Sequence, residues 1–209
     1  MKLLPALHQT IQELEHTFDQ IPDERKTLLR QLSDYIREKQ QAGGPVNLVF
    51  ICTHNSRRSH MAQLWAQAAS AYYGIGQVHC YSGGTEATAF NPRAVEAMRE
   101  AGFDIPPAGP EANPAYEVRF AAEAPPVRLW SKTFDDPANP ATGFGAVMTC
   151  SDADENCPLV PGLERRLAIT YDDPKHFDDT PQETEKYRER ARQIGRELLY
   201  GIKEARVSR

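Results

Sequence analysis

The sequence has no long hydrophobic run and no excess of positive charge, and each absence excludes a class of protein. No stretch of the 209 residues reaches the apolar length of a membrane-spanning helix. The net charge of −5 argues against nucleic acid or an anionic membrane as the main partner. The first residues run quickly into Gln, Glu and His and lack the apolar segment of a signal peptide. We therefore expect a cytoplasmic protein without membrane association.

Cysteine is scarce as well. The chain has 4 cysteines, too few for the disulfide scaffold of a small secreted domain. Cys150 and Cys157 are separated by six residues, which is not the Cys-x2–4-Cys spacing of zinc sites. In a reducing compartment, paired cysteines that bind no metal are candidates for redox chemistry.

Residues 1–44 are predicted to form a helical hairpin added to a catalytic domain of residues 45–209. Leu7, Ile11 and Leu14 recur at the spacing of one helix face, and a second helix is expected to end near Gln41. Gly43-Gly44-Pro45 then marks the domain boundary. We expect the hairpin to pack on the catalytic domain or to mediate self-association, and the oligomeric state stays open.

From Val46 onward, strand-like and helical segments alternate, which predicts an α/β domain with a parallel sheet. The region 105–145 interrupts this pattern with a composition rich in Pro, Gly and Ala. Two short strand-like runs in it are expected to pair as an antiparallel hairpin, which would cover the substrate, form an interface or protect a sheet edge. A capping-box pattern predicts that the last helix begins at Thr180. The core strands are expected at residues 46–51, 78–81, 146–149 and 166–170, and the hairpin strands at 116–120 and 127–134.

A cysteine and an arginine flank a short loop between the first predicted strand and the helix after it. Cys52 and Arg58 have the spacing Cys-x5-Arg. Unpaired N–H groups and the positive dipole end of the helix favour an anion at this point, together with the thiolate form of Cys52. Arg58 can donate two hydrogen bonds to the oxygens of a phosphate or an arsenate. We therefore expect a nucleophile in an oxyanion-binding loop. The alternative is a free cysteine ending a core strand and a surface arginine.

Polar residues gather at one edge of the predicted sheet. Four of them stand at or just after a strand end: Cys52, Ser82, Cys150 and Asp173. Ligands of open parallel sheets bind beyond the carboxyl ends of the strands, so these residues are expected to share a pocket. Cys52 would attack the central atom of the oxyanion, and Asp173 would protonate the leaving oxygen. Asp172 is the alternative acid, and both aspartates are also typical turn residues.

The pair Cys150 and Cys157 favours a reductase over a simple hydrolase. A second thiol can attack the sulfur of Cys52 once an oxyanion is bonded to it, and a third can take over the disulfide by exchange. A hydrolytic phosphatase needs only the nucleophilic thiol. The alternative is that the two are semi-buried cysteines flanking a turn.

Several segments together resemble the low-molecular-weight protein-tyrosine-phosphatase superfamily and, within it, the thioredoxin-coupled arsenate reductases. The similar segments are residues 52–59 (the phosphate loop), 82–87 and 91–98 (the second strand and helix), 150–158 (the redox segment) and 171–174 (the acid loop). The similarity covers residues 46–105 and 146 to the C-terminus. It implies a doubly wound α/β fold with a four-stranded parallel sheet, phosphotyrosine phosphatase I-like, which the β-hairpin insertion and the N-terminal helical hairpin extend.

The resemblance also implies roles for individual residues. Cys52 would be the nucleophile, Arg58 the oxyanion clamp and Asp173 the acid. Asn55 and Ser82 would support the loop. The loop residues expected around the oxyanion are Thr53, His54, Asn55, Ser56, Arg57, Arg58 and Ser59.

By the same resemblance, the cysteines would form a relay. The first disulfide would join Cys52 to Cys150 and the second Cys150 to Cys157, and thioredoxin or a similar thiol donor would reduce the latter. No bound cofactor and no metal are expected.

Some positions depart from the family pattern. His54 and Arg57 stand where a glycine and a cysteine are common, and a second cation at the loop would strengthen anion binding or alter which substrate fits. Lys175-His176-Phe177 follows the Asp-Pro pair where tyrosine phosphatases usually carry two tyrosines, although Phe177 or Trp130 would supply an aromatic wall.

Three functions follow from these residues. The first hypothesis is an arsenate reductase acting on an oxyanion substrate. The alternative is a phosphatase that hydrolyses phosphotyrosine or other phosphomonoesters through a cysteinyl-phosphate. The third is a non-enzymatic oxyanion-binding or redox-sensing module.

Overall fold

The apolar strands expected from the sequence form a four-stranded parallel sheet in a computed structural model of the chain, which describes residues 1–156 and 160–206. The strands are β1 (Val46–Cys52), β2 (Val78–Gly84), β5 (Phe144–Met148) and β6 (Leu163–Ala168). Their order in the sheet is β2-β1-β5-β6, with β1 paired in parallel to both β2 and β5. Because Ile51 pairs with Met148, the carboxyl ends of β1 and β5 lie side by side. The predicted α/β class and parallel sheet are confirmed.

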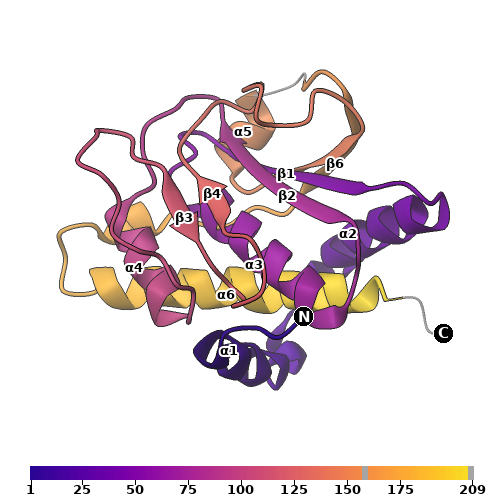
Figure 1. The fold of residues 1–209 in the computed structure, drawn as a ribbon, viewed down its shortest axis with the longest axis horizontal. Coiled ribbons are helices and arrows are strands. Elements are labelled where there is room, and N and C mark those ends of the chain that lie inside the picture. The colour runs from indigo at the N-terminus through magenta and orange to yellow at the C-terminus, as the bar shows by residue number, and fades with distance from the viewer. Residues whose placement is uncertain (157–159, 207–209) are drawn as a thin grey trace.

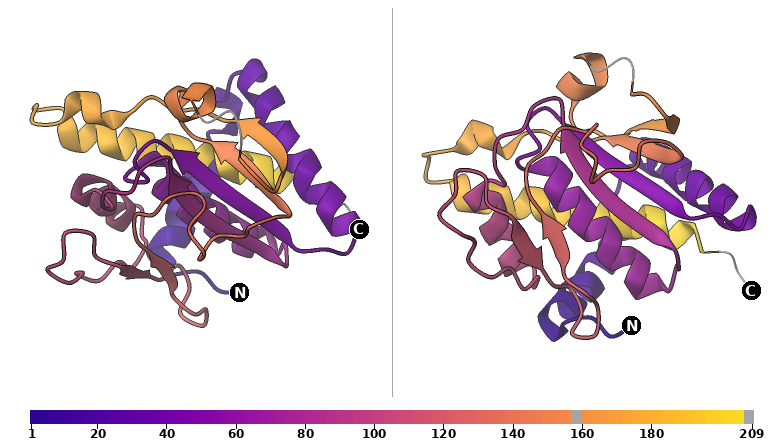
Figure 2. Two further views of the ribbon diagram at one scale, coloured as in Figure 1. Left: turned by 90° about the horizontal axis from the view of Figure 1, so that it is seen from above. Right: turned by 45° about the horizontal axis from the view of Figure 1, so that its top comes forward.

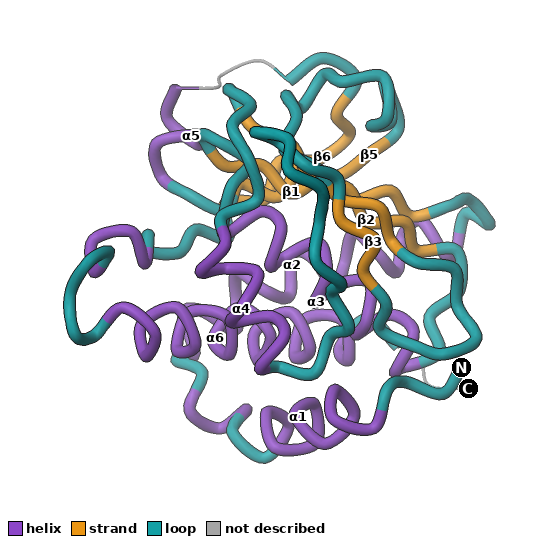
Figure 3. Tube along the Cα trace, turned by 60° about the vertical axis from the view of Figure 1, so that its left-hand side comes forward, coloured by secondary structure: helices purple, strands orange, loops and turns teal. Residues whose placement is uncertain are grey.

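Helices cover one face of the sheet in successive layers (Figures 1 and 3). The helix α3 (Arg58–Tyr73) follows β1 across a short loop and packs on β1 and β2. The longest helix, α6 (Glu183–Glu204), packs on α3, and α4 (Pro92–Glu100) packs on α6 in turn. Within the described residues, no helix is both long enough and apolar enough to cross a membrane.

The N-terminal segment is integrated into this helical side. It consists of α1 (Pro5–Glu15), a short 3-10 helix η1 (Phe18–Gln20) and α2 (Asp23–Gln41). Both α1 and α2 pack against α6, and α2 also reaches β6 and β1. Figure 2 shows the N-terminus and α1 on the side of α6 away from the sheet. The predicted helices and their packing on the body are confirmed, and a domain boundary between residues 44 and 45 stays a prediction.

Alternation along β1 separates two hydrophobic clusters. Leu48 and Phe50 belong to the large core on the helical face, whereas Val49 and Ile51 belong to a smaller cluster on the opposite face. The short helix α5 (Ser151–Asn156), which begins just after β5, contributes Ala153 to this smaller cluster. Side chains of a strand point alternately to the two faces of a sheet, which explains the separation.

The region 105–145 contains the expected antiparallel hairpin, formed by β3 (Tyr116–Val118) and β4 (Val127–Leu129) as a separate two-stranded sheet. After β4 the chain runs beside the end of β2. There the N–H of Gly84 donates to the carbonyl of Lys132, and the carbonyl of Gly84 accepts the N–H of Phe134, both at 2.9 Å. At Gly83 a Cβ atom would lie 2.4 Å from Cα of Phe134, so glycine permits this close approach. The insertion therefore extends to the carboxyl edge of the sheet.

The start of α6 differs from the prediction. The helix begins at Glu183, and residues 180–182 form a turn before it. The Glu183 carboxylate accepts a hydrogen bond from the N–H of Asp179 at 2.7 Å, not from Thr180 as a capping box at Thr180 requires. The Thr180 hydroxyl instead donates to the carbonyl of Phe177, which ends the 3-10 helix η2 (Pro174–Phe177). Because Thr180 takes part in the turn that closes η2, α6 begins three residues later than predicted.

Candidate active site

The loop between β1 and α3 holds Cys52 at its start. Sγ of Cys52 lies 3.0 Å from Oγ of Ser59, and both side chains are buried. Ser59 in turn accepts a 2.9 Å hydrogen bond from the amide of Asn55. Asn55 is fully buried with φ of +43°, a conformation that asparagine tolerates better than most residues. The loop therefore places a hydroxyl donor beside the sulfur and fixes that hydroxyl from behind.

The carbonyl groups of the loop are bonded to surrounding segments. Those of Cys52, Thr53, His54 and Ser56 all accept hydrogen bonds from outside the loop. The donors are the N–H groups of Thr85, Glu86 and Asn91 and the hydroxyls of Thr85, Thr88 and Ser131. Since the first N–H groups of a helix have no intrahelical acceptor, those at the start of α3 remain to bind an anion.

Arg58 is the first residue of α3 and points toward the loop after β6. Its two terminal nitrogens donate to the carbonyl of Tyr171 at 2.8 Å and to the carboxylate of Asp173 at 2.5 Å. Its Nε is buried and has no hydrogen-bond partner among the described residues. A buried donor without a protein acceptor fits a site for an oxyanion oxygen.

Asp173 and Asp172 occupy different environments, which separates the two candidate acids. Asp173 caps the N-terminus of η2 by accepting the N–H of Lys175 at 3.0 Å, and its other oxygen pairs with Arg58. Asp172 has a 91% exposed side chain and lies 3.5 Å from Arg190. The structure thus places Asp173, and not Asp172, beside the loop arginine.

Cys150 follows β5 and lies next to the loop. Its Sγ is 3.6 Å from Oγ1 of Thr53, the residue after Cys52, and Cys150 is 1% exposed. The N–H of Ala153 in α5 donates to the same sulfur at 3.3 Å. Cys52 and Cys150 belong to the same buried cluster. Two buried thiols therefore lie at the carboxyl ends of adjacent parallel strands.

The remaining cysteines are Cys80, in a core strand, and Cys157. Cys80 lies within β2 in the large hydrophobic core, where burial raises the pKa of its thiol. A buried thiol of this kind fits a structural role for Cys80. Cys157, expected to complete the relay, lies outside the described residues.

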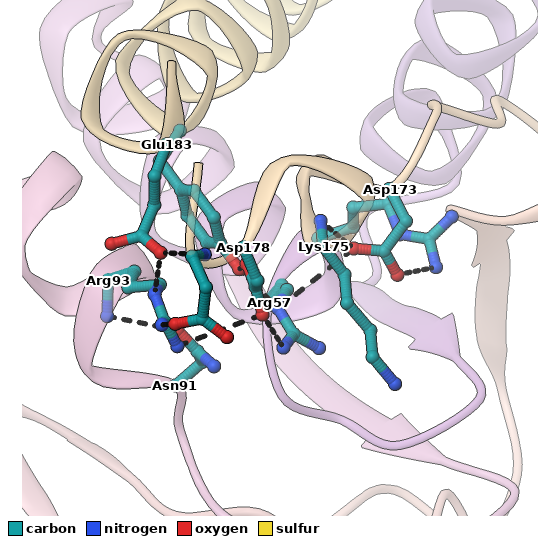
Figure 4. Close-up of polar contacts among 10 residues, drawn as sticks. Arg57, Asn91, Arg93, Asp173, Lys175, Asp178 and Glu183 are labelled. Carbon is teal, nitrogen blue, oxygen red and sulfur yellow. Dashed lines mark hydrogen bonds and ion pairs between the residues drawn. The ribbon is translucent and has the colours of Figure 1, made fainter. Parts of the chain in front are cut away.

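Arg57 is held by partners on the C-terminal side of the site (Figure 4). Its Nε donates to the Tyr187 hydroxyl at 2.7 Å, and a terminal nitrogen donates to Asp178 at 3.3 Å. Asp178 also accepts from the Tyr187 hydroxyl and pairs with Arg93 of α4. Nε of Arg57 is 4.0 Å from Asp173. The second cation of the loop thereby ties the segment after Asp173 to α4 and α6.

Thr53 and His54 make different contacts at the rim. The Thr53 hydroxyl donates to Asp152 of α5 at 2.6 Å. The half-exposed ring of His54 lies 3.7 Å from the carboxylate of Glu86. These side chains connect the loop to α5 on one side and to the loop after β2 on the other.

Ser82 is expected to support the loop, and its side chain contacts α3, the helix that follows the loop. Its hydroxyl lies 3.2 Å from Nδ1 of His60, which is fully buried and stacks on Phe90 with ring centroids 4.4 Å apart. Burial, together with the charge of Lys132, lowers the pKa of His60 to about 3. Ser82 therefore holds a neutral histidine in the first turn of α3.

The insertion supplies site residues that sequence patterns did not identify. Ser131 donates its hydroxyl to the carbonyl of His54 at 3.0 Å and accepts the N–H of Thr88 at 2.8 Å. The side-chain amide of Asn113 bonds both the backbone N–H and the backbone carbonyl of Ser131. Lys132 lies on the ring of Trp130 at 4.6 Å, and burial lowers the pKa of Lys132 to about 8. No motif marks Asn113 and Ser131, because their contacts are to backbone groups distant in sequence.

Together the loop, its arginine and the neighbouring thiol can bind a tetrahedral anion and attack it with sulfur. Residues 47–116 match the low molecular weight phosphotyrosine protein phosphatase family. An arsenate reductase of Bacillus licheniformis is 32% identical over 155 residues, which cover 72% of this chain and 91% of that protein. An arsenate reductase of Bacillus subtilis is 33% identical over 152 residues, with 72% and 91% covered.

The chain is also similar to a solved structure, a low molecular weight phosphotyrosine phosphatase from Vibrio cholerae O395. The TM-score is 0.48 at 14% identity, with 74% of this chain and 93% of that chain covered. The sequence relatives carry the assignment. The chain belongs to the low molecular weight phosphotyrosine protein phosphatase family, in the branch that contains these arsenate reductases.

Proposed function

We propose that this chain reduces arsenate to arsenite, with Cys52 as the nucleophile and a disulfide relay through Cys150 and Cys157. One observation carries the proposal. Cys52 ends β1, and Cys150 follows the adjacent parallel strand β5. Both belong to one buried cluster, and Oγ1 of Thr53 lies 3.6 Å from the Cys150 sulfur. The arsenate reductases similar to this chain support the same substrate.

In the first step, the Cys52 thiolate displaces one oxygen of arsenate and forms a sulfur–arsenic bond. The N–H groups at the start of α3 and the Arg58 guanidinium stabilise the negative charge on the remaining oxygens. Asp173 donates a proton to the leaving oxygen, which departs as water. The hydroxyl of Ser59, 3.0 Å from the sulfur, stabilises the attacking thiolate.

In the second step, the Cys150 thiolate attacks the sulfur of Cys52. The electron pair of the sulfur–arsenic bond stays on arsenic, so that As(V) becomes As(III) and arsenite leaves while a Cys52–Cys150 disulfide forms. Cys157 then attacks Cys150, which releases Cys52 as a thiolate. An external dithiol, for which we propose thioredoxin, returns two electrons to the Cys150–Cys157 disulfide.

A second candidate function is the hydrolysis of phosphomonoesters. Nucleophile, arginine clamp and acid form a complete set without Cys150 and Cys157, and phosphate is nearly the same size and shape as arsenate. In that case Cys52 forms a cysteinyl-phosphate, Asp173 protonates the leaving alcohol and water completes the reaction.

A Cys150→Ser variant separates the two functions. The reductase proposal predicts that wild type produces arsenite from arsenate with thioredoxin, thioredoxin reductase and NADPH, and that this variant produces none in excess of the enzyme. If the variant produces arsenite at the wild-type rate, the relay is wrong. Hydrolysis of an aryl phosphate by wild type, abolished in Cys52→Ser and without any arsenite production, would favour the phosphatase.

A further inference from the structure

An arginine of the N-terminal segment lies behind the loop that carries the proposed acid. Arg25 belongs to α2, and its Nε pairs with the buried carboxylate of Glu197 in α6 at 2.7 Å. A terminal nitrogen of Arg25 donates to the carbonyl of Thr170 at 2.9 Å. The guanidinium also stacks over the ring of Tyr171 at 4.7 Å. One side chain of the N-terminal segment therefore contacts both residues that precede Asp172.

These contacts fix a single peptide unit. The carbonyl of Thr170 and the N–H of Tyr171 belong to the same plane. Arg25 holds the carbonyl, and the carbonyl of Thr149, one residue before Cys150, accepts the N–H at 3.1 Å. Because both ends of this plane are bonded and the Tyr171 ring lies under the Arg25 guanidinium, the Cα atom of Tyr171, to which the next carbonyl is attached, is restrained.

The carbonyl of Tyr171 is the group that Arg58 contacts. It accepts a hydrogen bond from Arg58 at 2.8 Å, and the other terminal nitrogen of Arg58 reaches Asp173. The backbone from Thr170 to Asp173 thus orients the arginine expected to bind the oxyanion.

We propose that Arg25 is a positioning residue for the oxyanion site: through Thr170 and Tyr171 it sets the orientation of Arg58 and Asp173. The proposal rests on the proposed function of Cys52 and Arg58 as an oxyanion site. The N-terminal helices then have a role in that site, because Arg25 lies in α2 and its side chain bonds the loop that carries Asp173.

The geometry of Arg25 requires arginine. Nε and a terminal nitrogen bond different acceptors at once, and the central carbon of the guanidinium lies over the ring of Tyr171. A lysine carries a single ammonium that cannot reproduce both the fork and the stacking. We therefore expect Arg25→Lys to restore only part of the effect of Arg25.

The test measures binding of inorganic phosphate to the full chain by isothermal titration calorimetry. Removing Arg25 alone would leave the buried carboxylate of Glu197 without its cation. The test variant therefore carries both Arg25→Met and Glu197→Gln, and its reference is the single variant Glu197→Gln. We expect the double variant to bind phosphate roughly three- to thirtyfold more weakly than Glu197→Gln. The phosphate affinity of Arg25→Lys should lie between that of wild type and that of the double variant.

A matched control distinguishes positioning from general stability. Arg99 of α4 also bonds a backbone carbonyl, that of Ile105 at 2.8 Å, and a carboxylate, that of Glu96. Arg99→Met is expected to leave phosphate affinity unchanged. Urea denaturation of every variant shows whether affinity and stability change together.

Equal phosphate affinity of the double variant and Glu197→Gln would overturn the proposal, and so would the same loss of affinity in Arg99→Met. If the double variant does not fold, Arg25→Lys provides the comparison, and wild-type affinity in that variant would overturn the proposal. Absence of phosphate binding by wild type itself would contradict the oxyanion site, and the positioning role would fail with it. Those two failures are distinct, because the first leaves wild-type binding intact.

Discussion

The backbone N–H of Lys132 donates a 2.9 Å hydrogen bond to the side-chain oxygen of Asn55, 77 positions earlier in the chain. Asn55 is fully buried, and its amide nitrogen bonds Ser59, which in turn lies beside Cys52. A segment of the insertion therefore holds the centre of the oxyanion loop, and the shape of that loop depends on residues outside the Cys-x5-Arg motif.

Replacing Asn55 tests this support. Asn55→Ala leaves the N–H of Lys132 without its acceptor inside the protein, which is expected to lower the free energy of unfolding by roughly 1 to 3 kcal/mol. The same variant should lose most of its phosphate affinity. Urea denaturation and calorimetric titration measure the two effects. Asn47→Ala, which removes a 3.3 Å bond to Gly143 near the other end of β1, should keep its phosphate affinity.

Ser59 is expected to control the reactivity of the nucleophile. Its hydroxyl lies 3.0 Å from the sulfur of Cys52, and a hydrogen bond to a charged group is among the stronger ones. Ser59→Ala should slow alkylation of Cys52 by iodoacetamide at neutral pH by about tenfold. The control is Ser70→Ala, at a buried serine of the same helix whose hydroxyl, within the described residues, bonds only the backbone carbonyl of Ala66. Equal alkylation rates in wild type and Ser59→Ala would show that this hydroxyl does not stabilise the thiolate.

Lys132 should make stability depend on pH. Burial lowers its pKa from 10.5 to about 8, so between these values the unfolded chain binds the proton and the folded chain does not. Stability from this group therefore rises as the pH increases from 8 toward 10.5, and below pH 8 the buried charge is unfavourable. Lys132→Met should be more stable than wild type at pH 7, by roughly 1 to 3 kcal/mol, and the difference should shrink near pH 10.

Urea denaturation at both pH values measures that difference. Lys2→Met, at an exposed lysine, serves as the control and should show no such trend. A constant difference between Lys132→Met and wild type across this range would contradict a lowered pKa for Lys132.

Tyr187 is expected to hold the segment after Asp173. Its hydroxyl accepts from Arg57 and donates to Asp178, both at 2.7 Å, and burial raises its pKa so that it keeps its proton. Tyr187→Phe should lower kcat about three- to tenfold by loosening the position of Asp173. The control Tyr72→Phe removes a hydroxyl of α3 that donates to Glu15 of α1, and it should retain kcat. Similar kcat values for Tyr187→Phe and wild type would argue that Asp178 is held well enough by its arginines.

The fold was predictable because its signals are local. The run from Val46 to Ile51, apolar except for Asn47, predicts a buried strand, and it forms β1. Pro92 is typical of a first helical turn, and α4 begins there, with the Asn91 side chain accepting the N–H of Arg93. The Cys-x5-Arg spacing likewise lies within one strand, loop and helix. The start of α6 was wrong by three residues because the turn closing η2 competes for Thr180.

The support that the insertion and α2 give to the site was not predictable, because it consists of long-range contacts to backbone groups. Ser131 binds the carbonyl of His54, and Arg25 binds that of Thr170, and neither contact depends on a recognisable partner side chain. The residues alone do not separate Asp173 from Asp172; the family resemblance favours Asp173, and the structure places it at the cap of η2. The part played by Cys157 and the cytoplasmic location stay predictions.

Arsenite formed per enzyme molecule, in the presence of thioredoxin, thioredoxin reductase and NADPH, tests the proposed relay most directly. We predict many turnovers in wild type and at most one in Cys157→Ser, because that variant cannot release Cys52 from its disulfide with Cys150. No arsenite from wild type, with hydrolysis of an aryl phosphate that depends on Cys52, would contradict the account and identify the chain as a phosphatase.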